Sequence, residues 1–167
     1  RRSSDLAILL VAFGSTWNNA FKAFDATKAA YEKAFPQSDV YVSYSSAICI
    51  NRAAAGENTD ENGKIVKRNY YAPNFWLHAF ATAKYKDITV QSLQVIPGEE
   101  YSRVINYIKD FANNHLGDLD DEYLQGLDGH LWLGTPLLNN TNDVATVATI
   151  IDQQYKGLAA QGVVAFM

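Results

Sequence analysis

Runs of apolar residues alternate along this chain with polar turns, a pattern that predicts strands separated by helices. Residues 6–13 (LAILLVAF) are continuously apolar and end at Gly14, which is typical of a strand buried on both faces of a parallel sheet. Later segments show either such runs or alternation of apolar and polar positions. They predict further strands at residues 39–45, 88–95, 130–134 and 162–167.

Between these strands, apolar residues recur at helical spacing. This spacing predicts helices at residues 18–34, 47–55, 73–85, 99–113 and 143–160. Asn18 or Asn19 can cap the first helix, and Pro73 suits the first turn of the third. Two polar segments remain: residues 56–69, interpreted as a surface loop or hairpin insertion, and residues 115–128, interpreted as an acidic linker.

The order of these elements, β-α-β-α-α-β-α-β-α-β, predicts an α/β fold with a doubly wound, mostly parallel sheet. A length of 167 residues fits one domain, or one domain with an elaboration. In this architecture a covering helix normally follows a strand, whereas the predicted strand at residues 162–167 has none. We therefore expect the chain to be part of a longer protein.

Composition and charge narrow the classes of function. No apolar run approaches the roughly 20 residues that a membrane span requires. The net charge of -4 and the scatter of the 14 Lys and Arg residues argue against a nucleic-acid partner. The single cysteine, Cys49, excludes an internal disulfide and a multi-cysteine metal site, and we interpret it as a core thiol.

Two adjacent carboxylates, Glu99 and Glu100, are the first candidates for chemistry. They follow the predicted strand at residues 88–95 across a Pro97-Gly98 break and open an amphipathic helix. Ligands of open α/β sheets bind outside the carboxyl ends of the strands, where these side chains would lie. Acidic residues in a first helical turn also complement the helix dipole, typically by ~0.3 to 1 kcal/mol. Spacing alone favours this capping role.

The chain contains, in this order, the segments LLVAFGST, SSAICINR, VQSLQVIPGEEY, LWLGTPLLNNTND and VVAFM. Together they resemble the N-terminal domain of the anaerobic-type sirohydrochlorin cobaltochelatases, class II chelatases related to ferrochelatase. The resemblance spans nearly the whole chain in the right order, and the central segment is the most specific. Two departures stand out, because Gln94 replaces a histidine of the better-known cytoplasmic members and Asn51-Arg52 replaces an Arg-Lys pair.

The resemblance implies two similar α/β domains with a tetrapyrrole cleft between them. Residues 1–167 would form the N-terminal domain, and the C-terminal domain would lie outside this chain. The implied reaction is insertion of a divalent metal into sirohydrochlorin without ATP, with Co2+ preferred and Fe2+ or Ni2+ as other substrates. The central motif places the metal-binding glutamate at Glu100, and the first histidine would belong to a Gly-His-Gly motif following Met167.

Metal insertion makes chemical sense of a glutamate at this position. Two pyrrole N–H protons must leave while the ion sheds water, so Glu100 can serve as both oxygen ligand and proton acceptor. Glu99 is then the capping residue. Trp17 could lie against the macrocycle, and small polar groups could bind its carboxylates. The candidate substrate contacts are Gly14, Ser15, Thr16, Trp17, Ser45, Ser46 and Gly98.

Two alternatives to a chelatase stay open from the sequence. One is a tetrapyrrole-binding protein that carries haem or a corrinoid without inserting metal. The other is a flavodoxin-like domain that binds a small phosphate ligand at residues 14–18. The family that the chain resembles is usually cytoplasmic, which favours a cytoplasmic location, but it also includes exported, periplasmic members. A homo-oligomer is possible, because an incomplete domain pair could expose an apolar face.

Overall fold

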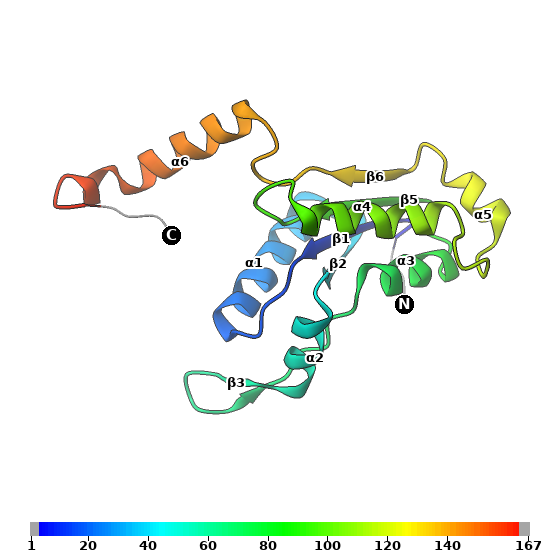
Figure 1. The fold of residues 1–167 in the computed structure, drawn as a ribbon, viewed down its shortest axis with the longest axis horizontal. Helices are drawn as coiled ribbons and strands as arrows, with labels where there is room; N and C mark the ends of the chain where they lie inside the picture. The colour runs from blue at the N-terminus through cyan, green and yellow to red at the C-terminus, as the bar shows by residue number, and fades with distance from the viewer. Residues whose placement is uncertain (1–3, 164–167) are drawn as a thin grey trace.

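The computed structural model describes residues 4–163 (Figure 1). Of the strand predicted at residues 162–167, residues 164–167 therefore lie outside the described range. Among the described residues, no helix combines the length and the apolar character needed to cross a membrane.

A parallel sheet with strand order β2-β1-β5-β6 forms the centre of the molecule. Its strands are β1 (Leu6–Ala12), β2 (Ser38–Tyr44), β5 (Asp87–Ser92) and β6 (Leu131–Gly134). Because β1 pairs with β2 on one side and with β5 on the other, the chain reverses its winding direction at β1. The predicted α/β fold with a doubly wound parallel sheet is confirmed.

Helices surround this sheet, and a small hairpin extends from it. The helices are α1 (Asn18–Ala34), α2 (Ala47–Ala55), α3 (Pro73–Thr82), α4 (Glu99–Ala112), α5 (Asp121–Gly126) and α6 (Thr141–Ala159). β3 (Asn58–Thr59) and β4 (Ile65–Val66) pair antiparallel within the polar segment at residues 56–69. This confirms the hairpin form of the predicted insertion.

Side chains alternate along β1 and thereby divide the core between the two faces of the sheet. Leu9 lies in one buried cluster with Leu77 of α3 and Val104 of α4. Leu10 lies in a different cluster, against which Tyr31 of α1 packs. Helices therefore cover both faces of β1, and fully burying a side chain such as Leu9 contributes about 1.5–3 kcal/mol.

The acidic segment at residues 115–128 was wrongly interpreted as a linker alone, because it contains α5. The Asp120 carboxylate accepts hydrogen bonds from the backbone N–H groups of Glu122 and Tyr123, at 3.0 and 3.4 Å, and so caps this helix. The Tyr123 hydroxyl donates to the backbone carbonyl of Tyr85 across 2.7 Å, and Leu127 is buried. The segment is therefore docked on the domain.

Two predicted elements, β5 and α3, end three residues earlier than expected. β5 ends at Ser92 rather than at residue 95, and Val95 lies exposed beyond the sheet. α3 ends at Thr82 rather than at residue 85, because Lys84 has a φ of 58° that an α-helix cannot accommodate. Both differences arise where apolar residues continue past the end of the element.

The N-terminal ends of two helices also differ from the prediction. Trp17 is the N-cap of α1 and makes no side-chain capping bond, so the expected capping by Asn18 or Asn19 was wrong. α6 begins before the predicted residue 143. The Asn140 side chain accepts from the backbone N–H of Asp143, whose carboxylate accepts from the N–H of Asn140 in turn.

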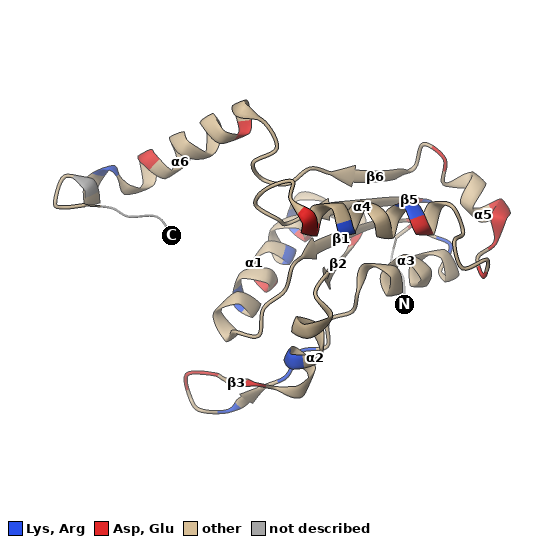
Figure 2. Ribbon diagram, viewed as in Figure 1, with Lys and Arg blue, Asp and Glu red and all other residues tan. Residues whose placement is uncertain are grey.

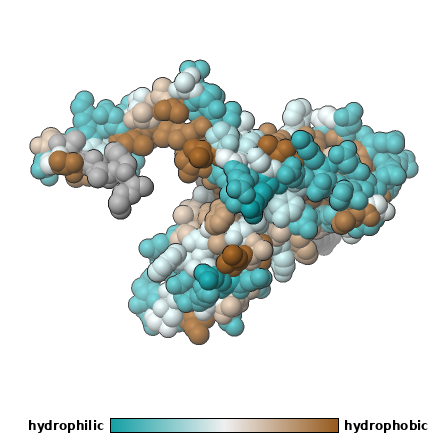
Figure 3. Space-filling view, viewed as in Figure 1, coloured by the Kyte–Doolittle hydropathy of each residue, from teal (hydrophilic) through white to brown (hydrophobic). Residues whose placement is uncertain are grey.

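α6 projects away from the sheet and its covering helices (Figure 1). Val144, Ile150 and Leu158 of this helix are exposed. Figure 3 shows apolar surface along the side of α6 that faces the notch between this helix and the rest of the molecule. The helix therefore presents apolar residues that no described segment covers.

Candidate functional site

The segments that follow β1, β2 and β5 meet at the carboxyl edge of the sheet. The register pairs Ala12 with Tyr44 and Val11 with Ser92, so these strands end at the same level. Beyond the strands, the backbone N–H of Ser45 donates to the carbonyl of Ala12 across 2.9 Å. The predicted site residues of these three segments therefore lie at one edge, beside the strand at which the winding reverses.

Ser45 and Glu100 are in direct contact at this edge. The Ser45 hydroxyl donates a hydrogen bond to Oε2 of Glu100 across 3.2 Å. Ser45 is only 6% exposed, whereas 30% of the Glu100 side chain is accessible. The carboxylate is thus held by the protein and still open to an incoming ligand.

Arg103 is a further charged neighbour of Glu100, and the sequence did not single it out. Its Nε lies 3.8 Å from Oε1 of Glu100, while its Nη2 donates to Oε1 of Glu99 across 2.9 Å. The hydrogen bond to Glu99, followed by the charge of Glu100, raises the pKa of the Arg103 guanidinium. Both carboxylates occupy the first turn of α4, as predicted, and the three side chains form one charged group. Figure 2 shows acidic and basic positions side by side at this end of α4.

Gly14 occupies a position that admits only glycine. Its φ is 121°, a conformation that L side chains rarely adopt. A Cβ atom placed there would lie 2.7 Å from Cβ of Cys49 and 2.7 Å from Cδ2 of Tyr44. The backbone at Gly14 therefore packs directly against the end of β2 and the start of α2.

The loop after Gly14 is fixed by polar contacts that were not predicted. The Ser15 hydroxyl accepts a hydrogen bond from the backbone N–H of Trp17 across 3.2 Å. The Thr16 carbonyl accepts one from Nδ2 of Asn58, in the β3–β4 hairpin, across 2.8 Å. Trp17 itself is 70% exposed at the start of α1, where it is free to contact a ligand.

Ser46 has a structural contact of its own. Its side chain accepts a hydrogen bond from the backbone N–H of Cys49 and caps α2. Cys49 is partly buried and packs against the apolar cluster that contains Phe21 and Tyr44, which agrees with its interpretation as a core thiol. Gly98 is the N-cap residue of α4.

Large apolar side chains are exposed in the segments around this edge. They follow β1, β5 and β6 or lie at the starts of α1, α2 and α3, and so concentrate near the carboxyl ends of the strands. Exposed apolar surface of this kind is typical of a ligand or protein contact. The residues are Phe13, Trp17, Ile48, Tyr71, Phe75, Val95, Ile96 and Leu137.

Comparison with known proteins agrees with this arrangement. The sequence model of the family described as "Cobalt chelatase (CbiK)" matches residues 6–167. The chain belongs to the cobalt chelatase family. It is 25% identical over 162 residues to a protein of Salmonella typhimurium named sirohydrochlorin cobaltochelatase, and the match covers 96% of this chain and 53% of that protein. The chain thus spans about half the length of the curated relative that it matches.

The two departures from the cobalt chelatase pattern have structural contacts of their own. The Gln94 side chain is buried, and its Oε1 accepts a hydrogen bond from the Ser92 hydroxyl. Arg52, in the last turn of α2, pairs through Nε with Oε1 of Glu57, in the segment that follows the helix, at 3.3 Å. The guanidinium of Arg52 and Oε1 of Gln94 therefore have partners, whereas Nε2 of Gln94 is buried without a hydrogen-bond partner among the described residues.

The histidines of this cobalt chelatase domain lie away from Glu100. His130 precedes β6 and contacts Asp87, at the start of β5, across 2.7 Å. Both residues belong to the amino edge of the sheet, opposite to the edge that carries Glu100. Within residues 4–163, no three His, Cys, Asp or Glu side chains gather closely enough to hold a metal ion. Glu100 is thus an isolated candidate ligand in the described part of the chain.

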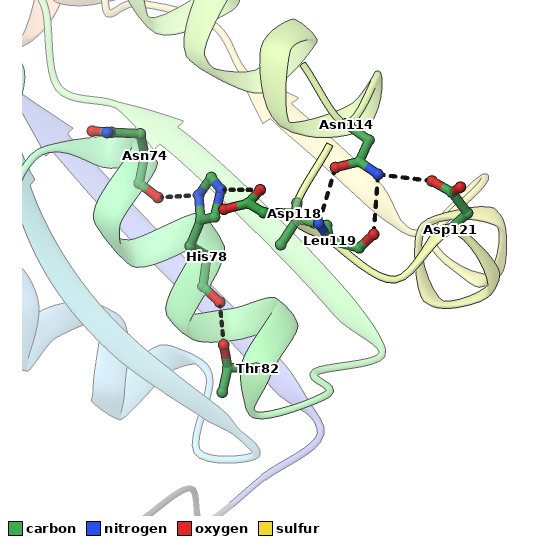
Figure 4. Close-up of polar contacts among 7 residues, drawn as sticks. All are labelled: Asn74, His78, Thr82, Asn114, Asp118, Leu119 and Asp121. Atoms are coloured by element: carbon green, nitrogen blue, oxygen red, sulfur yellow. Dashed lines mark hydrogen bonds and ion pairs between the residues drawn. The ribbon is translucent and has the colours of Figure 1, made fainter. Parts of the chain in front are cut away.

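A second polar cluster, between α3 and the loop that follows α4, lines a cavity of about 170 Å3 (Figure 4). His78 places Nδ1 2.8 Å from the carbonyl of Asn74 and Nε2 3.3 Å from Oδ1 of Asp118. The Asn114 amide donates to the carbonyl of Leu119 across 3.0 Å. These contacts tie the loop after α4 to α3, which indicates a structural role.

Proposed function

We propose that this chain forms one domain of a sirohydrochlorin cobaltochelatase, in which Glu100 binds the incoming metal ion and accepts protons from the tetrapyrrole. The family and the name of the Salmonella typhimurium relative support the reaction. The role of Glu100 is supported by its contact with Ser45. This contact holds an accessible carboxylate at the edge of the sheet beside β1, where the winding direction of the chain reverses.

The chemistry requires a group with the properties of Glu100. When Co2+ enters the macrocycle, two pyrrole N–H bonds break, the metal forms bonds to the ring nitrogens, and two protons leave. A carboxylate can take a place in the coordination sphere of the metal as water leaves, and it can accept a proton. Arg103 lies close enough to moderate the negative charge of Glu100.

The surface around Glu100 suits a flat, partly apolar ring that carries carboxylates. Trp17 and the other exposed apolar residues supply area for the ring. Backbone and hydroxyl groups at Gly14, Ser15, Thr16 and Ser46, together with Gly98, are proposed to bind the carboxylates of the ring. We infer these contacts from the position of the residues at the carboxyl edge of the sheet.

Co2+ is the proposed substrate metal, with Fe2+ and Ni2+ as further substrates, and the reaction proceeds without ATP. The sequence contains neither a Walker loop nor a GxGxxG fingerprint after its first strand. The matched segment covers 53% of the relative, so we propose that a second domain supplies the opposite wall of the cleft and the imidazole ligands.

The test uses the protein that contains both domains, mixed with sirohydrochlorin and Co2+, with insertion followed by absorbance. The wild type is expected to exceed the spontaneous rate. Glu100→Gln should lower kcat by about 100-fold or more, the usual scale for loss of a positioned acid or base. The matched control is Glu122→Gln, which also removes an exposed carboxylate from the first turn of a helix and should leave kcat unchanged.

Each other outcome contradicts part of this proposal. A wild-type rate equal to the background rejects the chelatase function. If sirohydrochlorin nevertheless binds, the result favours the tetrapyrrole-binding alternative. Wild-type kcat in Glu100→Gln rejects this residue as ligand and base. Unfolding of Glu100→Gln, detected by circular dichroism, would mean that the carboxylate is structural.

A further inference from the structure

We infer that Ser45 is a positioning residue, whose hydroxyl orients the Glu100 carboxylate for metal insertion rather than binding the substrate. This inference rests on the proposed function. A serine hydroxyl has one proton to donate, and Ser45 donates it to Oε2 of Glu100. With 6% of Ser45 exposed, little of the residue is accessible to a substrate carboxylate.

The backbone around Ser45 holds this donor in place. The N–H of Ser45 donates to Ala12 across 2.9 Å, and the N–H of Ser46 donates to Phe13 across 3.0 Å. Two residues earlier, the Ser43 hydroxyl donates to the carbonyl of Tyr71 across 2.8 Å. The backbone that carries the Ser45 hydroxyl is thus held by the end of β1 and by the segment at Tyr71, whereas the acceptor of the hydroxyl belongs to α4.

The two oxygens of Glu100 consequently face different neighbours. Oε2 accepts the proton of Ser45, while Oε1 faces Nε of Arg103 at 3.8 Å. Arg103 is drawn toward Glu99 by the shorter contact of 2.9 Å. If the bond from Ser45 is lost, the carboxylate can turn about its last side-chain torsion toward Arg103, since that torsion is broad. Ser45 therefore keeps lone pairs of Glu100 available to the metal and to the leaving protons.

A double-mutant cycle in the two-domain protein tests this role. Ser45→Ala should lower kcat about tenfold and leave KM for sirohydrochlorin within about twofold, because a tenfold loss is the scale of one hydrogen bond to a charged group. In a Glu100→Gln background, Ser45→Ala should cause no further loss. Ser102→Ala is the matched control, because Ser102 lies exposed on α4 and its hydroxyl donates to the carbonyl of Gly98, one turn earlier, rather than to a carboxylate. This control should keep wild-type kcat and KM.

The outcomes separate this inference from the proposed function. An unchanged kcat in Ser45→Ala, a rise in KM alone, or an equal loss with and without Glu100 overturns the positioning role while the chelatase function stands. If the wild type inserts no metal, the proposed function fails. The wild type, Ser45→Ala, Glu100→Gln and the double variant are then compared by urea unfolding. Additive effects of the two substitutions on the free energy of unfolding would show that the contact itself is absent.

Discussion

Nδ2 of Asn58 donates a hydrogen bond to the backbone carbonyl of Thr16 across 2.8 Å, although 42 positions separate the two residues. This contact ties the β3–β4 hairpin to the loop that follows β1. Two ion pairs, Lys22–Glu61 at 3.0 Å and Asp25–Arg68 at 2.7 Å, attach the same hairpin segment to α1. The polar insertion thus supports the loop that carries Trp17.

Asn58→Ala should therefore make the loop that follows β1 more mobile. We expect a loss of about 1 kcal/mol in the free energy of unfolding, the usual scale of one hydrogen bond, and faster proteolysis at residues 14–17. Affinity of the two-domain protein for sirohydrochlorin should fall several-fold, measured by quenching of tryptophan fluorescence. Asn62→Ala, in the turn of the same hairpin, is the control; equal effects from both variants would contradict the role of Asn58.

Gly14→Ala should destabilise the domain by about 2–3 kcal/mol, because it adds both backbone strain and overpacking. The strain comes from the φ of 121°, and the overpacking from contacts of 2.7 Å with Cys49 and Tyr44. Gly126→Ala provides the comparison, since its Cβ would meet no atom within 4 Å at the end of α5. Urea unfolding of both variants is the measurement, and similar stabilities would refute the steric requirement at Gly14.

Stability should decline at alkaline pH, and Tyr44 should contribute to that decline. Burial, and secondarily the neighbouring Tyr70, raises the pKa of the Tyr44 phenol above its ordinary value. The unfolded chain releases this proton near pH ~10 while the folded protein retains it, so the free energy of unfolding falls as the pH rises through that value.

Tyr44→Phe should make this alkaline decline shallower. The ring packing is kept, so the free energy of unfolding near pH 7 should change by no more than about 1 kcal/mol. Urea unfolding from pH 8 to 11 compares the variant with the wild type. The buried Tyr85, whose pKa is also raised by burial, leaves part of the decline in place. An identical slope in both proteins would show that Tyr44 does not contribute.

The strands and most helices could be predicted because their signals are local. The apolar run of β1 and the helical spacing of α4 each span enough residues to identify the element. α5 was missed because its six residues are too few to show a period, and its one strong signal, the Asp120 cap, lay within an acidic stretch. The partners of Arg103 and Asn58 could not be predicted, because charged and amide side chains have many possible contacts on a surface.

The sequence by itself determined the order of the sheet strands and of the longer helices, and placed the segments with Gly14, Ser45 and Glu100 at strand ends, because hydrophobic periodicity and turn residues act within short stretches of chain. Only the tertiary structure decided that the hydroxyl of Ser45 meets the carboxylate of Glu100. That contact depends on the register that aligns Ala12 with Tyr44 and Val11 with Ser92. Register follows from how side chains of distant segments pack on both faces of the sheet, since a slip by one residue would turn every side chain of a strand to the other face.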